Sequence, residues 1–350
     1  MRGEAPLTST SHVSREPLPS HASPLTFAHT PVLVDEVMTL LGSCRRVLDG
    51  TIGSAGHAAR LAAGGARVLG LDRDPTAVRA AGAALAGAAE VRLGDYADAA
   101  ADPEVALFRP DGILLDLGVS SPQIDDPARG FSFRPGTPLD MRMTAGEGPT
   151  AAEWLAGAGE AELAAAFRDW ADEPRARPLA REVVRRRATR PLAIADDLVG
   201  AIRAVLGPRS GPDDFARLFQ AVRIAVNGEI ERLARALPAL LEVAAPGGVL
   251  AVISYHSGED RTVKHAFQDW ARGCVCPPRQ PVCTCRGRPL GEVLTRRPLR
   301  PGPAETAANP RARSARLRGF RKAAPAEPAP AAQASSAPPA HDSPRRGTTA

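Results

Sequence analysis

The sequence predicts an α/β fold in which a doubly wound parallel sheet is interrupted by an inserted all-helical domain. Two observations support this prediction. Short apolar runs alternate with helical stretches between residues 47 and 117, and such alternation is typical of βαβ units. More than a hundred residues of helical character then separate the fourth apolar run from the fifth.

Five apolar runs are the predicted strands. They span residues 47–48, 67–71, 90–93, 112–117 and 249–254. A Gly-rich turn and a helical stretch that begins at His57 follow the first run, and Pro75 begins an Ala-rich helix after the second. In an open sheet of this kind, ligands bind at the carboxyl ends of the strands.

The helical insertion is predicted from apolar residues at helical spacing near residues 151–155, 160–170, 179–187 and 194–206. After it, residues 215–243 have the pattern of one long amphipathic helix that returns the chain to the sheet. We therefore expect residues 26–125 and 216–322 to form the sheet domain, which binds the cofactor. We expect residues 126–215 to form a helical domain that recognises the substrate.

Length and composition limit the class of protein. The chain has 350 residues, of which 44% are hydrophobic and 24% are charged, so most of it is globular. Residues 1–25 and 323–350 are rich in Ser, Pro and Ala, and we expect disordered tails there. No apolar run is long enough for a membrane helix, and the N-terminus has no apolar leader. We expect a cytoplasmic protein without a membrane partner.

Basic charge is concentrated in two tracts of a chain whose formal net charge is +5. Residues 174–190 hold seven arginines and one acid, and residues 286–322 hold eleven basic residues and two acids. Such tracts are the electrostatic footprint of a protein that binds a polyanion. A solvated helix face followed by a basic tail is the alternative interpretation.

The turn after the first strand favours a cofactor that contains a nucleoside. It runs from Asp49 to His57 as DGTIGSAGH, and its glycines allow the backbone to approach a ligand closely. Asp72 ends the second strand, where a carboxylate can accept hydrogen bonds from both ribose hydroxyls. The GxxGxxG spacing differs from the GxGxxG of dinucleotide sites. Asp95-Tyr96 after the third strand favours S-adenosylmethionine, because the ring can lie on the adenine and the acid can meet its amino group. A turn with only a structural role remains possible at this point.

Eight motifs, in order between His29 and Arg321, resemble those of the RsmH/MraW family. They are HTPVLVDEV from His29, DGTIGSAGH from Asp49, LDRDP from Leu71, DGILLDLGVSSPQIDDPARGFSF from Asp111, PLDMRM from Pro138, FQAVRIAVN from Phe219, SYHSGEDR from Ser254 and NPRARSARLR from Asn309. The resemblance implies a class I methyltransferase domain with an inserted helical domain. It also implies S-adenosylmethionine as methyl donor and methylation of N4 of a cytidine in the decoding region of 16S rRNA, within the small ribosomal subunit. DNA is not expected as a partner, and the oligomeric state is left open.

The resemblance also implies which residues contact the cofactor. In this sequence they are Ala55, Gly56, His57, Asp72, Tyr96, Asp116 and Gln123.

Catalytic residues are harder to choose. Cytosine N4 is a poor nucleophile because its lone pair is delocalised, so most of the rate gain is expected from positioning. Ser121 follows the fourth strand, where its hydroxyl can accept a hydrogen bond from N4; a turn or cap is the structural alternative. Asp140 is a candidate acceptor of the released proton, and a salt bridge with Arg142 is its alternative. His256 is a further candidate for the same role, although we expect it to orient the loop after the fifth strand.

Four of the five cysteines lie in the run CVCPPRQPVCTC, at Cys274, Cys276, Cys283 and Cys285. Two CxC pairs can surround one structural zinc ion, but the spacing is not that of a CxxC knuckle. A reduced loop whose cysteines pair on exposure to air is the alternative. We therefore assign no metal ligand from the sequence.

Two other classes of protein compete with a methyltransferase. An NAD-dependent oxidoreductase would share the Gly-rich turn and Asp72, but it would need a second binding half and a hydride-transfer site, which the sequence lacks. A ribosome assembly factor without catalysis would explain the basic tracts, but not an intact pocket for a methyl donor. Identification of any bound S-adenosyl compound separates the three classes.

Overall fold

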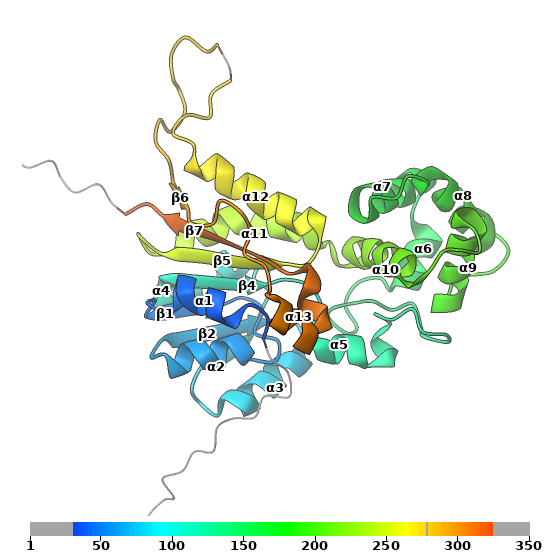
Figure 1. Ribbon diagram of the computed structural model, residues 1–350, viewed down its shortest axis with the longest axis horizontal. Coiled ribbons are helices and arrows are strands. Elements are labelled where there is room, and N and C mark those ends of the chain that lie inside the picture. Colours follow the sequence, from blue (N-terminus) through cyan, green and yellow to red (C-terminus); the bar gives the residue numbers. More distant parts are fainter. Residues whose placement is uncertain (1–30, 278, 325–350) are drawn as a thin grey trace, which may run out of the picture.

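The computed structural model describes residues 31–277 and 279–324. At its centre lies a seven-stranded sheet with the strand order β3-β2-β1-β4-β5-β7-β6 (Figure 1). The strands are β1 (Arg46–Asp49), β2 (Arg67–Asp72), β3 (Glu90–Leu93), β4 (Gly112–Asp116), β5 (Val249–Ser254), β6 (Gly291–Val293) and β7 (Arg316–Lys322). Strands β1 to β5 pair in parallel, which confirms the five predicted strands.

Strands β6 and β7 were not predicted from the sequence. They pair antiparallel to each other, and β7 also pairs antiparallel to β5. Arginines alternate with Leu317, Gly319 and Phe320 in β7, so the segment has the composition of a basic surface tract. Residues 286–322 were expected to bind a polyanion, with a solvated basic tail as the alternative. Neither interpretation included β7, which is an internal strand between β5 and β6.

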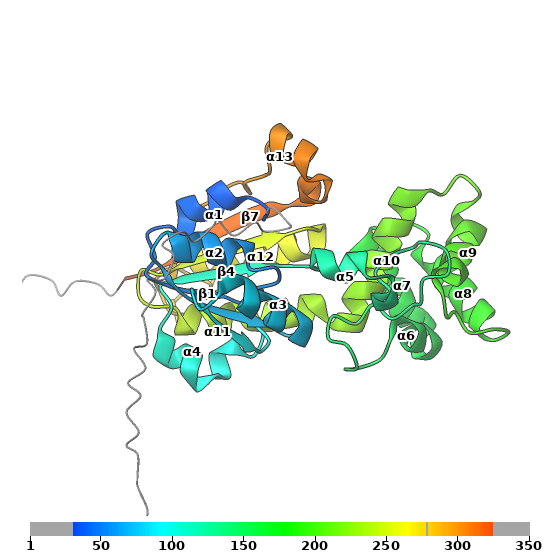
Figure 2. The same cartoon turned by 90° about the horizontal axis from the view of Figure 1, so that it is seen from below.

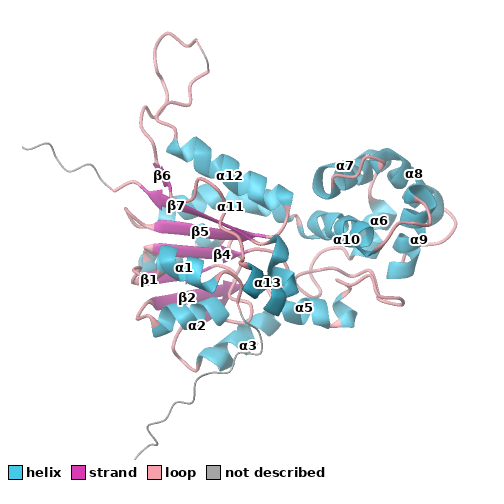
Figure 3. Ribbon diagram, in the orientation of Figure 1, coloured by secondary structure: helices cyan, strands magenta, loops and turns pink. Residues whose placement is uncertain are grey.

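Helices cover both faces of the sheet (Figure 3). One layer consists of α1 (Val34–Leu41), α2 (Gly56–Ala63) and α3 (Pro75–Leu85), and the other of α4 (Pro103–Phe108), α11 (Glu229–Val243) and α12 (Ser257–Ala271). Successive residues of a strand point to opposite faces. Leu114 accordingly lies in the core beneath α1 and α2, whereas Ile113 and Leu115 lie in the core beneath α11 and α12.

The chain between β4 and α11 contains α5 (Ser121–Asp125), α6 (Ala151–Gly157), α7 (Glu160–Ala171), α8 (Ala176–Arg187), α9 (Ala195–Leu206) and α10 (Pro212–Asn227). Helices α6 to α10 share a core of their own around Phe167, Leu179 and Leu218. Figure 2 shows these helices grouped beyond the end of the sheet from which α5 emerges. The expected boundary between residues 215 and 216 falls inside α10.

The single long helix predicted over residues 215–243 is wrong, because the chain forms α10 and α11 on either side of Gly228. Gly228 has φ 58°, a left-handed conformation that glycine adopts at no steric cost. The apolar spacing continues across the break, so periodicity alone did not reveal it. Helix α10 packs in the helical insertion and α11 packs on the sheet.

The remaining elements are short. They are η1 (Ala99–Ala101), η2 (Pro127–Arg129), α13 (Pro303–Ala308) and η3 (Pro310–Ser314). Within the part of the chain that the structure describes, no helix has the length and apolar character needed to cross a membrane. The disordered tail expected at residues 1–25, and all but two residues of the tail expected at 323–350, lie outside the described residues.

Candidate active site

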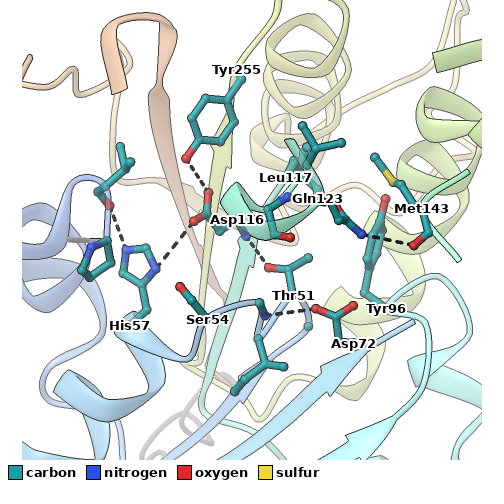
Figure 4. A pocket seen from close by; sticks show the side chains of 18 of the residues that line it. Thr51, Ser54, His57, Asp72, Tyr96, Asp116, Leu117, Gln123, Met143 and Tyr255 are labelled. Carbon is teal, nitrogen blue, oxygen red and sulfur yellow. Dashed lines mark hydrogen bonds and ion pairs between the residues drawn. The ribbon is translucent and has the colours of Figure 1, made fainter. Parts of the chain in front are cut away.

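A cavity of about 730 Å³ lies at the carboxyl ends of the parallel strands (Figure 4). This is where open α/β sheets bind their ligands, and the volume is in the range of small-molecule sites. Its walls come from the turn after β1, from the ends of β2, β3 and β4, and from α11 and the segment after β5. Six of the seven residues predicted to contact the cofactor line it: Gly56, His57, Asp72, Tyr96, Asp116 and Gln123.

The Gly-rich turn is held in an open shape by local hydrogen bonds. The Thr51 amide donates to the carboxylate of Asp49 at 3.1 Å, and the Gly53 amide donates to the carboxylate of Asp72 at 3.0 Å. Gly53 and Ala55 both have positive φ, at 46° and 65°. Ala55 is the N-cap of α2 and is fully buried in the core rather than in the cavity wall.

Asp72 and Tyr96 stand at the ends of neighbouring strands. The two carboxylate oxygens of Asp72 accept hydrogen bonds from the amides of Gly53 and Asp74, and burial raises the pKa of this carboxyl group. Each oxygen keeps a second lone pair for a ligand hydroxyl. The carboxylate of Asp95, by contrast, is engaged by Arg232 and by the Ala97 amide. A hydrogen bond from the adenine amino group to Asp95 would therefore have to compete with this ion pair.

Asp116 is the centre of a buried polar network. Tyr255 donates its hydroxyl to Oδ1 of Asp116 at 2.9 Å, and Nδ1 of His57 lies 3.7 Å from Oδ2. Nε2 of His57 donates to the carbonyl of Val32 at 2.8 Å, which fixes the ring (Figure 4). Burial raises the pKa of Asp116, while the neighbouring His57 opposes this effect. The amide of Asp116 lies 2.6 Å from the hydroxyl of Thr51, so all these groups are held in place.

Gln123 joins the cofactor side of the cavity to the start of the helical insertion. Its Oε1 accepts a hydrogen bond from the Ser120 amide at 3.0 Å. Its Nε2 donates to Asp74 at 3.2 Å and to the carbonyl of Met143 at 3.1 Å. Because these hydrogen bonds engage both ends of the buried amide, we infer that its main role is to position the surrounding wall.

Comparison of the sequence with known proteins identifies its family. A model of the MraW methylase family matches residues 26–323. The chain is 57% identical over 308 residues to the Ribosomal RNA small subunit methyltransferase H of Gemmatimonas aurantiaca. The aligned region covers 84% of this chain and 95% of that protein. It is 45% identical over 311 residues to the protein of the same name from Heliobacterium modesticaldum, which covers 85% of this chain and 99% of that one.

The chain belongs to the MraW methylase family. It is a methyltransferase with the class I, Rossmann-like fold, and its methyl donor is S-adenosylmethionine. The cavity fits this donor, because Asp72 offers a carboxylate to a ribose and Tyr96 offers a ring beside it. The turn after β1 packs closely against this wall: a Cβ added at Gly50 would lie 2.6 Å from Leu115 and 2.9 Å from Cβ of Tyr96, so glycine permits the close approach.

The two predicted catalytic residues differ in what the structure says of them. Ser121 is the first residue of α5, at the carboxyl end of β4, and its side chain is outside the described part. Asp140 forms the predicted alternative, an ion pair with Arg142 at 2.7 and 2.9 Å. Burial would raise the pKa of Asp140, but the hydrogen bonds from Arg142 outweigh this and lower it. A carboxylate held in this way is a weak proton acceptor, and Asp140 does not line the cavity.

Several residues of the cavity were quoted within motifs but given no role. Arg223 and Glu229 form a bidentate pair at 2.8 Å across the break at Gly228, and both line the cavity. Glu259 is buried and accepts a hydrogen bond from the Tyr255 amide at 2.8 Å. Arg223 lies in the motif FQAVRIAVN, and Tyr255 and Glu259 lie in SYHSGEDR, whereas Glu229 lies in neither motif. Only the folded chain brings them to the cavity.

His256 orients the segment after β5, as expected. It is the buried N-cap of α12, where Nδ1 accepts a hydrogen bond from the Glu259 amide at 3.4 Å. Its Nε2 lies 3.3 Å from Oε1 of Glu259 without the geometry of a hydrogen bond. His256 does not line the cavity.

The basic tracts are partly neutralised within the protein. In α8, Arg185 and Arg186 both pair with Glu182, and Arg187 donates to the carbonyls of Leu155 and Ala158. In β7, Arg318 is buried and pairs with Asp260. Arg187 and Arg318 are therefore part of the fold, whereas the Arg185 side chain is 68% exposed and stays accessible to a phosphate.

Proposed function

We propose that this methyltransferase modifies N4 of a cytidine in the decoding region of 16S rRNA, within the small ribosomal subunit and in the cytoplasm. The names of its relatives support rRNA of the small subunit as substrate. The resemblance described above supports the cytidine and its N4 atom. The observation that carries the proposal is one cavity whose two ends have different chemistry.

The first end suits the cofactor. Asp72 accepts hydrogen bonds from the ribose hydroxyls, the Tyr96 ring packs against the adenine, and the turn at Gly53 follows the ligand closely. Bound S-adenosylmethionine supplies an electrophilic methyl group. Gln123 holds the wall between this end and the insertion through its bonds to Asp74 and Met143.

The second end suits an amino group. It is lined by the loop from Leu117 to Ser120, by Asp116 and by Tyr255 (Figure 4). Backbone carbonyls and carboxylates there accept hydrogen bonds from an amino group and turn its lone pair toward the methyl group, which is catalysis by positioning. We keep Ser121 as a proposed acceptor and Asp140 as a proposed proton acceptor, the latter weakened by its pairing with Arg142. Asp116 is a buried alternative acceptor with a raised pKa.

The target base must leave its stacked neighbours to reach the second end, since the cavity lies at the sheet edge between α5 and α11. A loop or junction of rRNA meets this requirement better than a continuous duplex. The helical insertion and the exposed members of the basic tracts supply the remaining contacts in this proposal.

Transfer of tritium from labelled S-adenosylmethionine to undermethylated 30S subunits tests the proposal. We expect label in N4-methylcytidine after digestion to nucleosides, and no label in subunits that already carry the methyl group. The Asp72→Asn variant should lose most of the transfer at low cofactor concentration, whereas Asp213→Asn, on an exposed site in α10, should not. Label at C5 or on ribose would contradict the assignment of N4, and absence of any transfer would favour an assembly factor.

A further inference from the structure

The four cysteines of the segment between α12 and β6 come together in the folded chain. The Sγ atoms of Cys274, Cys276, Cys283 and Cys285 all lie within 4.8 Å of one another. The separations are 3.8 Å from Cys274 to Cys283, 3.8 Å from Cys276 to Cys283, 3.5 Å from Cys283 to Cys285 and 3.8 Å from Cys274 to Cys285. Four sulfur atoms from twelve residues thus form one compact cluster.

These separations are those of a tetrahedral site. Zinc binds a cysteine sulfur at about 2.3 Å, so the sulfur atoms of a Cys₄ site lie about 3.8 Å apart along each edge of the tetrahedron. A disulfide requires a sulfur–sulfur distance of about 2.05 Å, and all four separations are much longer. Four soft thiolates in a tetrahedron favour zinc among the common divalent ions.

The cluster lies in a segment that has no apolar core of its own. None of the described residues between 272 and 289 is buried, and Val282 is 71% exposed. Small units without an apolar core need a disulfide or a metal to fix their shape. Hydrogen bonds nevertheless bring the two cysteine pairs together: the Val275 amide donates to the sulfur of Cys285 at 3.3 Å, and Gln280 donates to Thr284 at 2.7 Å.

Both ends of the segment are fixed to the sheet domain. Arg286 donates to the carbonyls of Asp269 and Arg272 at the end of α12, and the Leu290 amide donates to the carbonyl of Trp270 at 2.8 Å. Figure 1 shows the segment beyond the C-terminal end of α12, at the opposite end of the sheet from α5. The cluster is therefore remote from the cavity and has no part in methyl transfer.

We propose that Cys274, Cys276, Cys283 and Cys285 bind one structural zinc ion. All four positions of the tetrahedron are filled by protein sulfur, which is the arrangement of a closed, non-catalytic site. The ion cross-links the two CxC pairs and fixes the turn between α12 and β6. This proposal is independent of the substrate and of the methyl donor.

Metal analysis of untagged full-length protein, purified without chelator, tests the proposal. We expect about one zinc ion per chain in the wild type and less than about a tenth of that in the Cys283→Ser/Cys285→Ser variant. Cys44→Ser is the matched control, because Cys44 lies apart from the cluster, where it donates to the carbonyl of Asp111. It should keep its zinc. After the zinc is exchanged for cobalt, the wild type should show the intense visible bands of tetrahedral thiolate coordination.

Three outcomes would overturn the proposal. The first is wild-type protein without zinc whose four thiols in this segment react freely with a thiol reagent. The second is protein from a reducing preparation in which mass spectrometry finds two disulfides in the segment. The third is iron in place of zinc in protein purified without air. Because the first and decisive measurement is made on the wild type, the result does not depend on the folding of a variant.

Discussion

Nε of Arg318, in β7, lies 2.6 Å from Oδ1 of Asp260, in the first turn of α12. Nη2 of the same arginine lies 3.2 Å from Oδ2, so the pair is bidentate, and the Arg318 side chain is only 9% exposed. The relationship joins an internal strand to the helix that follows β5. Arg318 therefore has a buried structural role, although the basic composition of its segment had indicated contact with RNA.

Arg318→Ala should destabilise the protein. Without Arg318, Asp260 keeps only a weaker partner, Arg316, whose Nη1 lies 3.5 Å from Oδ2. The loss of the bidentate hydrogen bonds should therefore cost about 1.5–3 kcal/mol in the free energy of unfolding. Arg313→Ala, in the exposed turn before β7, should change it by less than about 0.5 kcal/mol. Urea denaturation of the two variants checks the difference. Equal stability would mean that the ion pair is not maintained in solution.

Asp72→Ala should weaken cofactor binding without unfolding the chain. The carboxylate is placed to accept hydrogen bonds from the ribose hydroxyls, and the loss of hydrogen bonds to a charged group costs about 1.5–3 kcal/mol, or roughly tenfold to a hundredfold in affinity. Titration calorimetry with S-adenosylmethionine measures this loss. Asp213→Ala, on the exposed face of α10, is the control that should bind normally. A folded Asp72→Ala protein with wild-type affinity would contradict the proposal that Asp72 binds the ribose.

Asp49 should make the stability depend on pH. Burial raises the pKa of this carboxyl group to about 7, against about 3.9 in an unfolded chain. Between these values the folded state binds a proton that the unfolded state has lost. The contribution of Asp49 to the free energy of unfolding is therefore greatest below about pH 4 and falls as the pH rises toward 7.

Asp49→Asn removes this titration. The stability of the wild type relative to the variant should fall by as much as about 1.4 kcal/mol per pH unit within the window. Denaturation of both proteins at several pH values between about 5 and 8 measures the difference. A difference that is independent of pH would show that Asp49 titrates normally in the folded protein.

The parts of the site that lie in short segments were predictable from the sequence. The turn from Asp49 to His57 follows a recognisable apolar run, and Asp72 ends the next one. The family motifs then indicated the other residues proposed to contact the cofactor, and all the proposed residues except Ala55 line the cavity. The pairing of Arg223 with Glu229 was not predictable in the same way. It depends on the direction of the chain on either side of Gly228, and hydrophobic periodicity carries no information about that direction.

Strand β7 was not predicted for a different physical reason. In a segment where arginines alternate with apolar residues, composition suggests a solvated surface, and only a partner such as Asp260 makes burial of the charge tolerable. That partner is 58 residues away in the sequence. Clustered arginines are therefore a poor indicator of nucleic-acid binding where an acidic residue of another element can neutralise them.

Gly228→Ala should destabilise the junction between the helical insertion and the sheet domain. Gly228 has φ 58°, and a Cβ added there meets no atom within 4 Å, so the cost comes from the left-handed backbone alone. That cost is about 1–2 kcal/mol for a residue with a side chain. Gly82→Ala, at an exposed position inside α3 where an added Cβ also meets no atom within 4 Å, is a matched glycine control without this strain and should lose no stability. Denaturation midpoints measure both changes in stability.

If the Gly228→Ala chain relaxes instead by extending α10, the Arg223–Glu229 pair will separate, and methyl transfer will fall by more than the loss of stability explains. Equal stability and activity in the two variants would contradict the left-handed break between α10 and α11.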